Sequence, residues 1–263
     1  MLVRFAYISD VHFGFDRVSE KIAMIEYITH EEGVDLLLSG GDFDYIPLGK
    51  DEFEDVLNGV PLLSVYGNHD RPEFLEFYGI LMEDGVPYTY GDITICGFGG
   101  AVIRDTFSYP ETWNTPDYYL RKYLALRDAL VENLQPCDIL ITHESPLVVA
   151  NKDAEALGYW AGEKIDIKSY RNVFVVIAGL LVPKIYLCGH IHSSPYTLAE
   201  ILVSDYTLSP TKIPVLRVTS LYDNTYAVID YDEEIRIVIN QFRNGESKAV
   251  FETSYEKHSI KPI

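Results

Sequence analysis

The sequence Leu-Leu-Ser-Val-Tyr-Gly-Asn-His-Asp occupies residues 62–70. Its first half, Leu62–Tyr66, is a short and largely apolar run that is typical of a β-strand. Because the run is apolar on both of its faces, we expect a strand in a sheet that is covered on each side. The polar half, Gly67-Asn68-His69-Asp70, follows this strand directly. In open α/β sheets, the loops beyond the carboxyl ends of the strands are where ligand sites collect.

Four more predicted strands end in loops of the same kind. Together with the loop after Tyr66, these loops hold five of the seven histidines of the chain. Five strand ends that present Asp, His and Asn are expected to converge on one site. The four further loops are Asp10-Val11-His12, Gly40-Gly41-Asp42-Phe43-Asp44, Thr142-His143-Glu144 and Gly189-His190-Ile191-His192.

Short apolar runs alternate with longer segments of helical period over most of the chain. Such alternation predicts an α/β domain. The other predicted strands here are Leu2–Ser9, Val34–Ser39, Ile93–Cys96, Ile139–Thr142 and Lys184–Cys188. One predicted helix follows the stripe Val18, Ile22, Ile25 and Ile28 and stops at Gly33, and the others are Pro72–Met82 and Pro116–Leu134.

The pattern changes after residue 195. Ile213–Thr219, Thr225–Tyr231 and Ile235–Phe242 are closely spaced predicted strands. The last two are joined by a connection of hairpin length, Asp232-Glu233-Glu234. Alternating strands and helices that are followed by a meander indicate one α/β domain with a mixed, two-layered sheet arrangement.

The composition limits the function. The chain has 263 residues, of which 48% are hydrophobic and 23% charged, and this excludes a disordered or fibrous protein. The formal net charge is -19, and residues 1–100 alone hold 19 acidic and 5 basic side chains. Nucleic acids and acidic membranes would be repelled, so neither is an expected partner. The acidic excess is interpreted mainly as a solvated surface; the alternative is that some carboxylates bind cations.

Three features bear on the compartment. Cys96, Cys137 and Cys188 are scattered, so they form neither a disulfide framework nor a zinc knuckle and favour a reducing interior. The first residues lack the order of a signal peptide. The longest apolar stretch, Val173–Val182, is about half as long as a bilayer span. We expect a cytoplasmic protein that does not bind membranes.

The residue types in the five loops suit a metal site. Imidazole, carboxylate and amide oxygen without thiolate are the ligands of Mn²⁺, Fe or Zn²⁺ sites. In an extended segment, residues i and i+2 share a face, so Asp10/His12 and His190/His192 can each point into one pocket. A carboxylate can bridge two cations, and a two-metal centre stabilises the entering and leaving oxygens of an in-line displacement at phosphorus.

The ordered series Asp-x-His, Gly-Asp, Gly-Asn-His-Asp, strand-end His and Gly-His-x-His resembles the signature of the calcineurin-like metallophosphoesterase superfamily. The match runs from Asp10 to His192, about 70% of the chain. The resemblance implies an α/β fold, a four-layer α-β-β-α sandwich of two mixed β-sheets flanked by helices (the metallo-dependent phosphatase fold). We expect a single domain over residues 1–263, with a small lid or insertion around residues 101–135.

The resemblance also implies two divalent transition-metal ions as cofactors, with Mn²⁺ expected first and Fe, Zn or Ni as alternatives. Asp42 would bridge both ions. A hydroxide held between the ions would attack phosphorus in line, because two cations bring the pKa of water into the neutral range. The other implied ligands are Asp10, His12 and His192 for the first ion, and Asn68, His143 and His190 for the second.

His69 and Asp70 are the candidate catalytic residues. His69 resembles the family histidine that contacts the phosphate or protonates the leaving group. Many phosphatases of the superfamily pair this histidine with a carboxylate three positions after the Gly-Asp aspartate. That position is Tyr45 here, and Asp44 comes one residue earlier. Either Asp44 serves from a shifted backbone or Asp70 orients a neighbour, and the departure disfavours the protein-phosphatase branch.

The remaining candidates have structural explanations. Glu144 either reaches the pocket beside His143 or is a solvated residue at a strand end. The aromatic residues of 107–119 are interpreted as packing of a surface loop, with a lid that contacts the leaving group as the alternative. His30 and His258 are expected at the surface, and Cys188 is expected to be a buried thiol.

These observations favour a binuclear metal-dependent phosphoesterase that hydrolyses a phosphomonoester or a small phosphodiester. One alternative is a Mn²⁺-dependent DNA-repair nuclease, since Asp10-Val11-His12-Phe13-Gly14 resembles the opening motif of such nucleases, although the charge of -19 opposes it. The other alternative is a non-catalytic scaffold on the same fold. The expected partner is a small phosphoester substrate, and the sequence specifies neither the natural substrate nor the oligomeric state.

Overall fold

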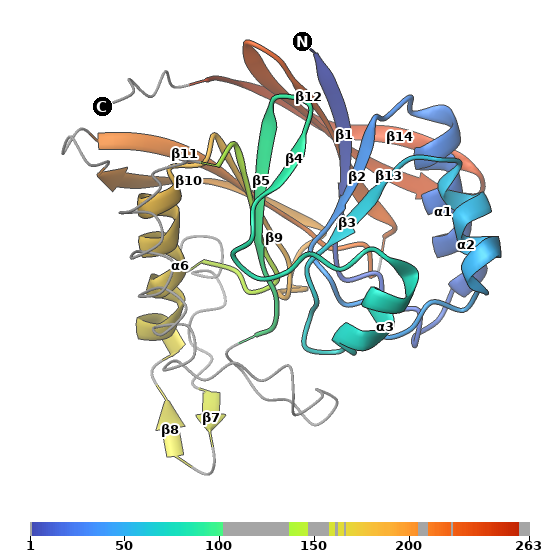
Figure 1. Ribbon diagram of the computed structural model, residues 1–263, viewed down its shortest axis with the longest axis horizontal. Coiled ribbons are helices and arrows are strands. Elements are labelled where there is room, and N and C mark those ends of the chain that lie inside the picture. The colour runs from blue at the N-terminus through green and yellow to red at the C-terminus, as the bar shows by residue number, and fades with distance from the viewer. Residues whose placement is uncertain are drawn as a thin grey trace.

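The computed structural model describes residues 2–101, 137–146, 158–160, 163–165, 167–204, 210–221 and 223–257. Two six-stranded sheets form the centre of the protein (Figure 1). The first sheet has the order β14-β13-β12-β1-β2-β3, and the second has the order β10-β11-β9-β6-β5-β4. A separate hairpin joins β7 (Gly158–Trp160) to β8 (Glu163–Ile165).

In the first sheet, β1, β2 and β3 run parallel, and β12, β13 and β14 continue from β1 as antiparallel strands. The sheet is therefore mixed. Its strands are β1 (Val3–Ile8), β2 (Leu36–Ser39), β3 (Leu62–Ser64), β12 (Thr225–Tyr231), β13 (Glu234–Arg243) and β14 (Glu246–Glu256).

In the second sheet, β5, β6, β9 and β11 run parallel, and antiparallel β4 and β10 form the two edges. This sheet is also mixed. Its strands are β4 (Tyr88–Tyr90), β5 (Ile93–Phe98), β6 (Ile139–Thr142), β9 (Ile185–Cys188), β10 (Tyr196–Ser204) and β11 (Pro210–Val218).

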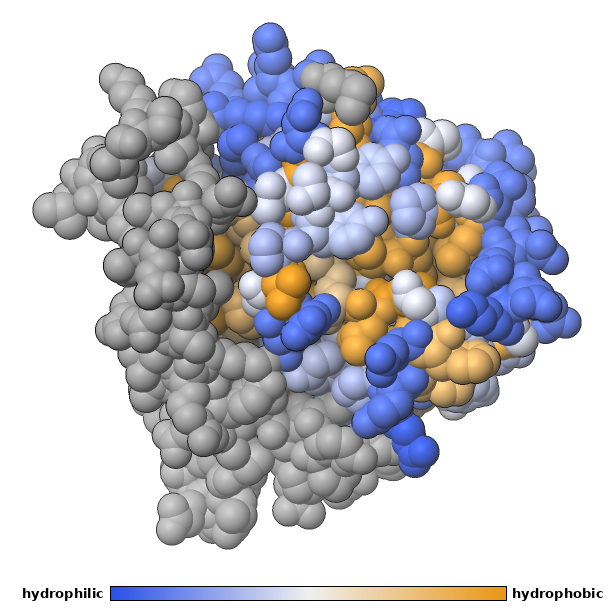
Figure 2. Space-filling view, viewed as in Figure 1, coloured by the Kyte–Doolittle hydropathy of each residue, from blue (hydrophilic) through white to orange (hydrophobic). Residues whose placement is uncertain are grey.

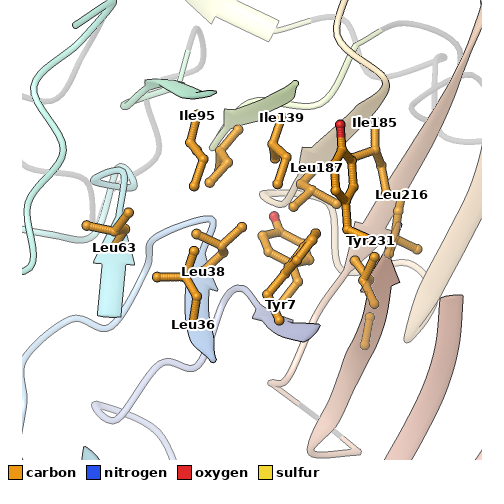
Figure 3. Close-up of a cluster of buried hydrophobic side chains, with 14 of the residues drawn as sticks. Tyr7, Leu36, Leu38, Leu63, Ile95, Ile139, Ile185, Leu187, Leu216 and Tyr231 are labelled. Carbon is orange, nitrogen blue, oxygen red and sulfur yellow. The ribbon is translucent and has the colours of Figure 1, made fainter. Parts of the chain in front are cut away.

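The sheets pack face to face through a core of buried aliphatic and aromatic side chains, part of which Figure 3 shows. Alternate residues of each strand enter this core, because successive side chains of a strand point to opposite faces. From the first sheet come residues such as Tyr7, Leu38 and Leu63, and from the second come Ile95, Ile139 and Leu187.

Helices cover both outer faces. The outward side chains of the first sheet, among them Ile8 and Leu37, pack against α1 (Val18–Glu31), α2 (Lys50–Leu57) and α3 (Pro72–Tyr78). Leu140 and Tyr186 of the second sheet pack against α6 (Ile167–Leu181). The four-layer α-β-β-α sandwich that was predicted is confirmed, with α1–α3 and α6 on opposite sides in Figure 1.

All six strands predicted before residue 190 are present, and Val18–Glu31 is helical with a left-handed Gly33 just beyond its end. The prediction of a helix over Pro72–Met82 is too long. Gly79 adopts φ 73° and ends α3 at Tyr78. The chain then runs beside β3, where the amide of Met82 donates to Ser64 O at 2.8 Å. The predicted helix Pro116–Leu134 lies outside the described residues, so it and the predicted lid stay predictions.

The predicted C-terminal meander is divided between the sheets. β11 belongs to the second sheet, whereas β12 and β13 belong to the first and form the predicted hairpin. The chain therefore crosses from one sheet to the other after Val218. None of the helices in the described ranges is long and apolar enough to span a bilayer.

Candidate metal centre

Backbone hydrogen bonds bring the five polar loops to one edge of the sandwich. The parallel pairing of β1 with β2 continues beyond both strands, since His12 N donates to Asp42 O at 2.8 Å. The pairing of β6 with β9 continues likewise, with Gly189 N donating to His143 O at 3.1 Å. Two side chains then join the sheets: His143 Nδ1 lies 2.7 Å from Gly40 O, and His190 N donates to Asp10 Oδ1 at 3.0 Å.

The first candidate ligand group contains Asp10, His12, Asp42 and His192, whose ligand atoms all lie within 4.8 Å of one another. His192 Nε2 lies 2.9 Å from Asp10 Oδ1, and His12 Nε2 lies 3.4 Å from Asp42 Oδ2. His12 Nε2 is buried and has no hydrogen-bond partner among the described atoms. A buried ring nitrogen without a hydrogen bond, facing two carboxylates, is the arrangement that a metal ion would complete.

The second group contains Asp42, His143 and His190, again within 4.8 Å. His143 Nε2 lies 3.3 Å from Asp42 Oδ2 and 2.9 Å from Asn68 Oδ1. All seven residues predicted as metal ligands therefore lie together. Asp42 belongs to both groups, which is the position that a bridging carboxylate requires.

Left-handed backbone occurs at five residues of these loops. Asp10, His12, Asp42, Asp44 and His190 have φ values between 51° and 69°. This conformation costs a non-glycine residue about 1–2 kcal/mol, so it persists only where the surrounding structure holds it. Its concentration in the cluster indicates that the loops are shaped to direct these side chains.

Two of the glycines that precede clustered residues, Gly67 and Gly189, are required by close approach. A Cβ atom at Gly67 would overlap Asp42 Oδ1, and one at Gly189 would overlap Ser9 Oγ and Asp10 Oδ2. The glycines thus allow neighbouring loops to pass near the two central carboxylates.

Asp70 holds the loops rather than facing the cluster. Its buried carboxylate accepts hydrogen bonds from the backbone amides of Asp42, Phe43, Asp44 and Gly67, at 2.7, 2.7, 3.1 and 2.8 Å. Burial, together with the nearby charge of Asp42, raises the pKa of Asp70 to about 6. These bonds fit the alternative that Asp70 orients a neighbour.

Asp44 is directed towards two histidines. Its Oδ1 lies 2.9 Å from His12 Nδ1, and its Oδ2 accepts the amide of Gly14 at 2.9 Å. The same Oδ1 lies 3.8 Å from His69 Nδ1. Asp44 therefore orients His12, as carboxylates beside metal-binding histidines commonly do, and lies next to His69. The backbone amide of His69 donates to Asp42 Oδ1 at 2.8 Å, which fixes His69 beside the candidate ligands.

The electrostatics of the cluster favour positive charge. Burial lowers the pKa of His12, but the carboxylates of Asp44, Asp42 and Asp10 outweigh it and raise the pKa to about 9. Burial likewise lowers the pKa of His143, and Asp42 with Asp10 raises it to about 10. In the absence of a metal, protons on the histidines balance the buried carboxylates, and divalent cations can supply the same charge.

Two buried charged residues near the cluster were not assigned a role from the sequence. Glu144 is buried, so the interpretation of a solvated glutamate is wrong; its Oε2 lies 3.9 Å from His190 Nε2. Lys21 of α1 is also buried and donates to His12 O at 2.7 Å. The signal for Lys21 was its place three residues after Val18 and four before Ile25, on the apolar stripe.

Of the other predictions on single residues, two are confirmed and the rest are not tested. His30 is exposed and Cys188 is a buried thiol, as predicted. His258 and the aromatic residues of 107–119 lie outside the described part of the chain.

The two mixed sheets, their outer helices and the cluster of His, Asp and Asn at the strand ends define a metallophosphoesterase fold. The sequence model of the family described as calcineurin-like phosphoesterase matches residues 3–194. The chain belongs to this family.

One solved structure supports the fold. GAP50, described as the anchor in the inner membrane complex of Plasmodium, has a TM-score of 0.58 and 14% identity, covering 99% of this chain and 90% of that one. A predicted phosphoesterase from Streptococcus pneumoniae has a TM-score of 0.42 and 14% identity, covering 97% of this chain and 99% of its own.

The calcineurin-like phosphoesterase YfkN from Bacillus subtilis has a TM-score of 0.45 and 13% identity, covering 97% of this chain and 90% of its own. Of the three, GAP50 alone is similar enough to support the fold. No curated protein sequence matches the chain.

Proposed function

We propose that the protein is a binuclear metal-dependent phosphoesterase that hydrolyses a phosphomonoester or a small phosphodiester. The observation that carries the proposal is the shared carboxylate: Asp42 lies in two ligand groups whose atoms are each within 4.8 Å of one another. One ion would be held by Asp10, His12, Asp42 and His192. The other would be held by Asp42, Asn68, His143 and His190.

The donor set supports hard or borderline divalent ions, with Mn²⁺ first and Fe, Zn or Ni as alternatives, because it offers oxygen and imidazole without thiolate. When bound, such ions would neutralise charge on phosphoryl oxygens and lower the pKa of water into the neutral range.

His69 is the residue of this chain that we assign to the substrate. Its side chain is partly exposed, whereas His12 and His143 are buried, so His69 can meet a phosphate or a leaving group. Asp44 Oδ1 and the bond from the His69 amide to Asp42 hold it at the edge of the cluster. In this position His69 would contact the phosphoryl group or donate a proton to the leaving oxygen.

The surface charge supports a small substrate rather than a long polyanion. Figure 2 shows a hydrophilic rim at the right of the molecule, the side on which Figure 1 places α2, whose exposed residues include Asp51, Glu52, Glu54 and Asp55. A net charge of -19 repels a long polyanion, so attraction of a phosphoester has to come from the centre itself.

Metal analysis and a substrate panel test the proposal directly. The purified protein should bind about two transition-metal ions and should cleave an aryl phosphate or a bis-aryl phosphate with Mn²⁺. Absence of both metal and turnover with Mn²⁺, Fe²⁺, Ni²⁺ and Zn²⁺ would overturn it. Salt-dependent DNA binding with exonuclease activity would instead favour the nuclease alternative.

One observation favours a non-catalytic function. GAP50, which shares the fold, is described as an anchor. The seven candidate ligands argue against a scaffold, because a protein without metal chemistry would not need to keep them together. Partner binding that depends on a surface far from Asp42, without turnover, would support the scaffold.

A further inference from the structure

Phe15 is an exposed aromatic side chain at the edge of the candidate centre. The residue is 54% exposed. It lies edge to face with His12, with centroids 5.2 Å apart and an interplanar angle of 86°. The rings of His69 and His192 also contact the His12 ring, with centroids 4.9 and 5.1 Å away. Phe15 is thus the apolar member of the three rings around a candidate metal ligand.

The loop that carries Phe15 is held in place. Phe15 N donates to His12 O at 3.1 Å, and Lys21 Nζ donates to the same carbonyl at 2.7 Å. Gly14 N donates to Asp44 Oδ2 at 2.9 Å, and a Cβ atom at Gly14 would collide with that oxygen. The backbone that presents Phe15 is therefore held in place, and it needs no ordering when a ligand arrives.

A second exposed aromatic residue follows the neighbouring loop. Tyr45 is 44% exposed and comes directly after Asp44. The two loops are paired, since Phe13 N donates to Phe43 O at 3.0 Å and Gly14 N donates to Asp44. An aromatic edge thus borders a cluster that is otherwise composed of carboxylates, imidazoles and an amide.

We infer that Phe15 contacts the leaving group and gives the site a preference for phosphoesters of alcohols that carry a flat aromatic ring. The inference rests on the proposed function: with the phosphoryl group at the ligand cluster and His69, the leaving group extends towards the rim. An aromatic pair contributes about 0.5–1.5 kcal/mol beyond buried area, which corresponds to about a twofold to tenfold effect on kcat/KM.

Benzyl phosphate and cyclohexylmethyl phosphate test this preference, because their leaving alcohols are similar in reactivity and differ in the aromatic ring. For the protein loaded with Mn²⁺, kcat/KM should be higher for the benzyl ester. Phe15→Ala should reduce kcat/KM for the benzyl ester about twofold to tenfold and change that for methyl phosphate less than twofold. Phe15→Leu keeps apolar bulk without the ring and should lose most of the preference for benzyl over cyclohexylmethyl phosphate.

Phe77→Ala is the matched control, since Phe77 is 60% exposed on α3 and is no part of the cluster. It should leave all three rates unchanged. Metal content of each variant should equal that of the wild type, which separates loss of contact from loss of the centre. An equal loss for benzyl and methyl phosphate on Phe15→Ala, or no loss, would overturn the inference while leaving the proposed function intact. If the wild type cleaves no phosphoester, the proposed function fails, and this inference fails with it.

Discussion

Binding of two metal ions should expel about two protons from His12 and His143 at pH 7. The pKa of His12 is raised to about 9 and that of His143 to about 10, so both rings are more than nine-tenths protonated at pH 7 without metal. Metal ligation requires the neutral imidazole. The carboxylates Asp10 and Asp42 contribute no protons, because their pKa values lie below the usual range.

The same pKa values give the free-energy cost of deprotonating the two rings so that they can bind metal. Removing a proton costs about 1.4 kcal/mol for each unit by which the pKa exceeds the pH. At pH 7 this is about 3 kcal/mol for His12 and about 4 kcal/mol for His143. Both shifts are upward, so protons compete with metal at low pH. Between about pH 6 and 8, His12 and His143 should together contribute about two units per pH unit to the rise in the logarithm of the overall affinity for two ions.

Calorimetry of Mn²⁺ binding in buffers of different ionisation enthalpy measures the protons released. His30→Ala is the control, because His30 is exposed on α1 and should leave the number unchanged. Binding of two ions at pH 7 without release of protons would refute the assignment of His12 and His143 as ligands, or the electrostatics that raise their pKa values.

Three further predictions concern single side chains. Asp42→Ala should lose metal and activity together, whereas His69→Ala should keep its metal and lose about 10²–10⁴-fold in kcat, as shown by metal analysis and steady-state kinetics; equal metal loss would contradict the role of His69. Asp44→Ala should weaken metal binding about 10–100-fold in a competition assay with a chelator, since His12 loses its carboxylate partner, and unchanged affinity would argue against that coupling. Lys21→Met should lower the free energy of unfolding by about 1–3 kcal/mol in urea, because His12 O keeps the Phe15 amide but loses its charged donor, and unchanged stability would contradict this.

The sequence predicts the strands and the polar loops well because both are local. Leu36–Ser39 and Ile139–Thr142 are apolar on both faces, and each passes directly into a polar loop. The parallel pairing of such strands places their ends at one edge, which is why seven candidate ligands that span most of the chain could be grouped before any geometry was known.

Elements without a continuous apolar run were missed, and so was α6, although it contains most of the longest apolar stretch, Val173–Val182. β14 is an exposed edge strand, and it lacks the buried side chains that would mark it. α2 buries only Phe53 and Leu57 and is eight residues long. The division of the C-terminal strands between two sheets also has no local signal, because pairing of β11 with β9 depends on residues about thirty positions apart.

The charge of the candidate centre is balanced separately from the acidic surface of the protein. Two divalent ions would change the formal charge only from -19 to roughly -15, so the acidity of the surface is independent of the centre. Within the centre, Asp10 and Asp42 are buried and are balanced by His12 and His143. At pH 7, protons on these rings are the alternative to metal, so the buried carboxylates have compensating positive charge in either case. If the substrate is a phosphoester, as proposed, its attraction to this acidic protein would depend on the cations, and productive binding would be restricted to the loaded centre.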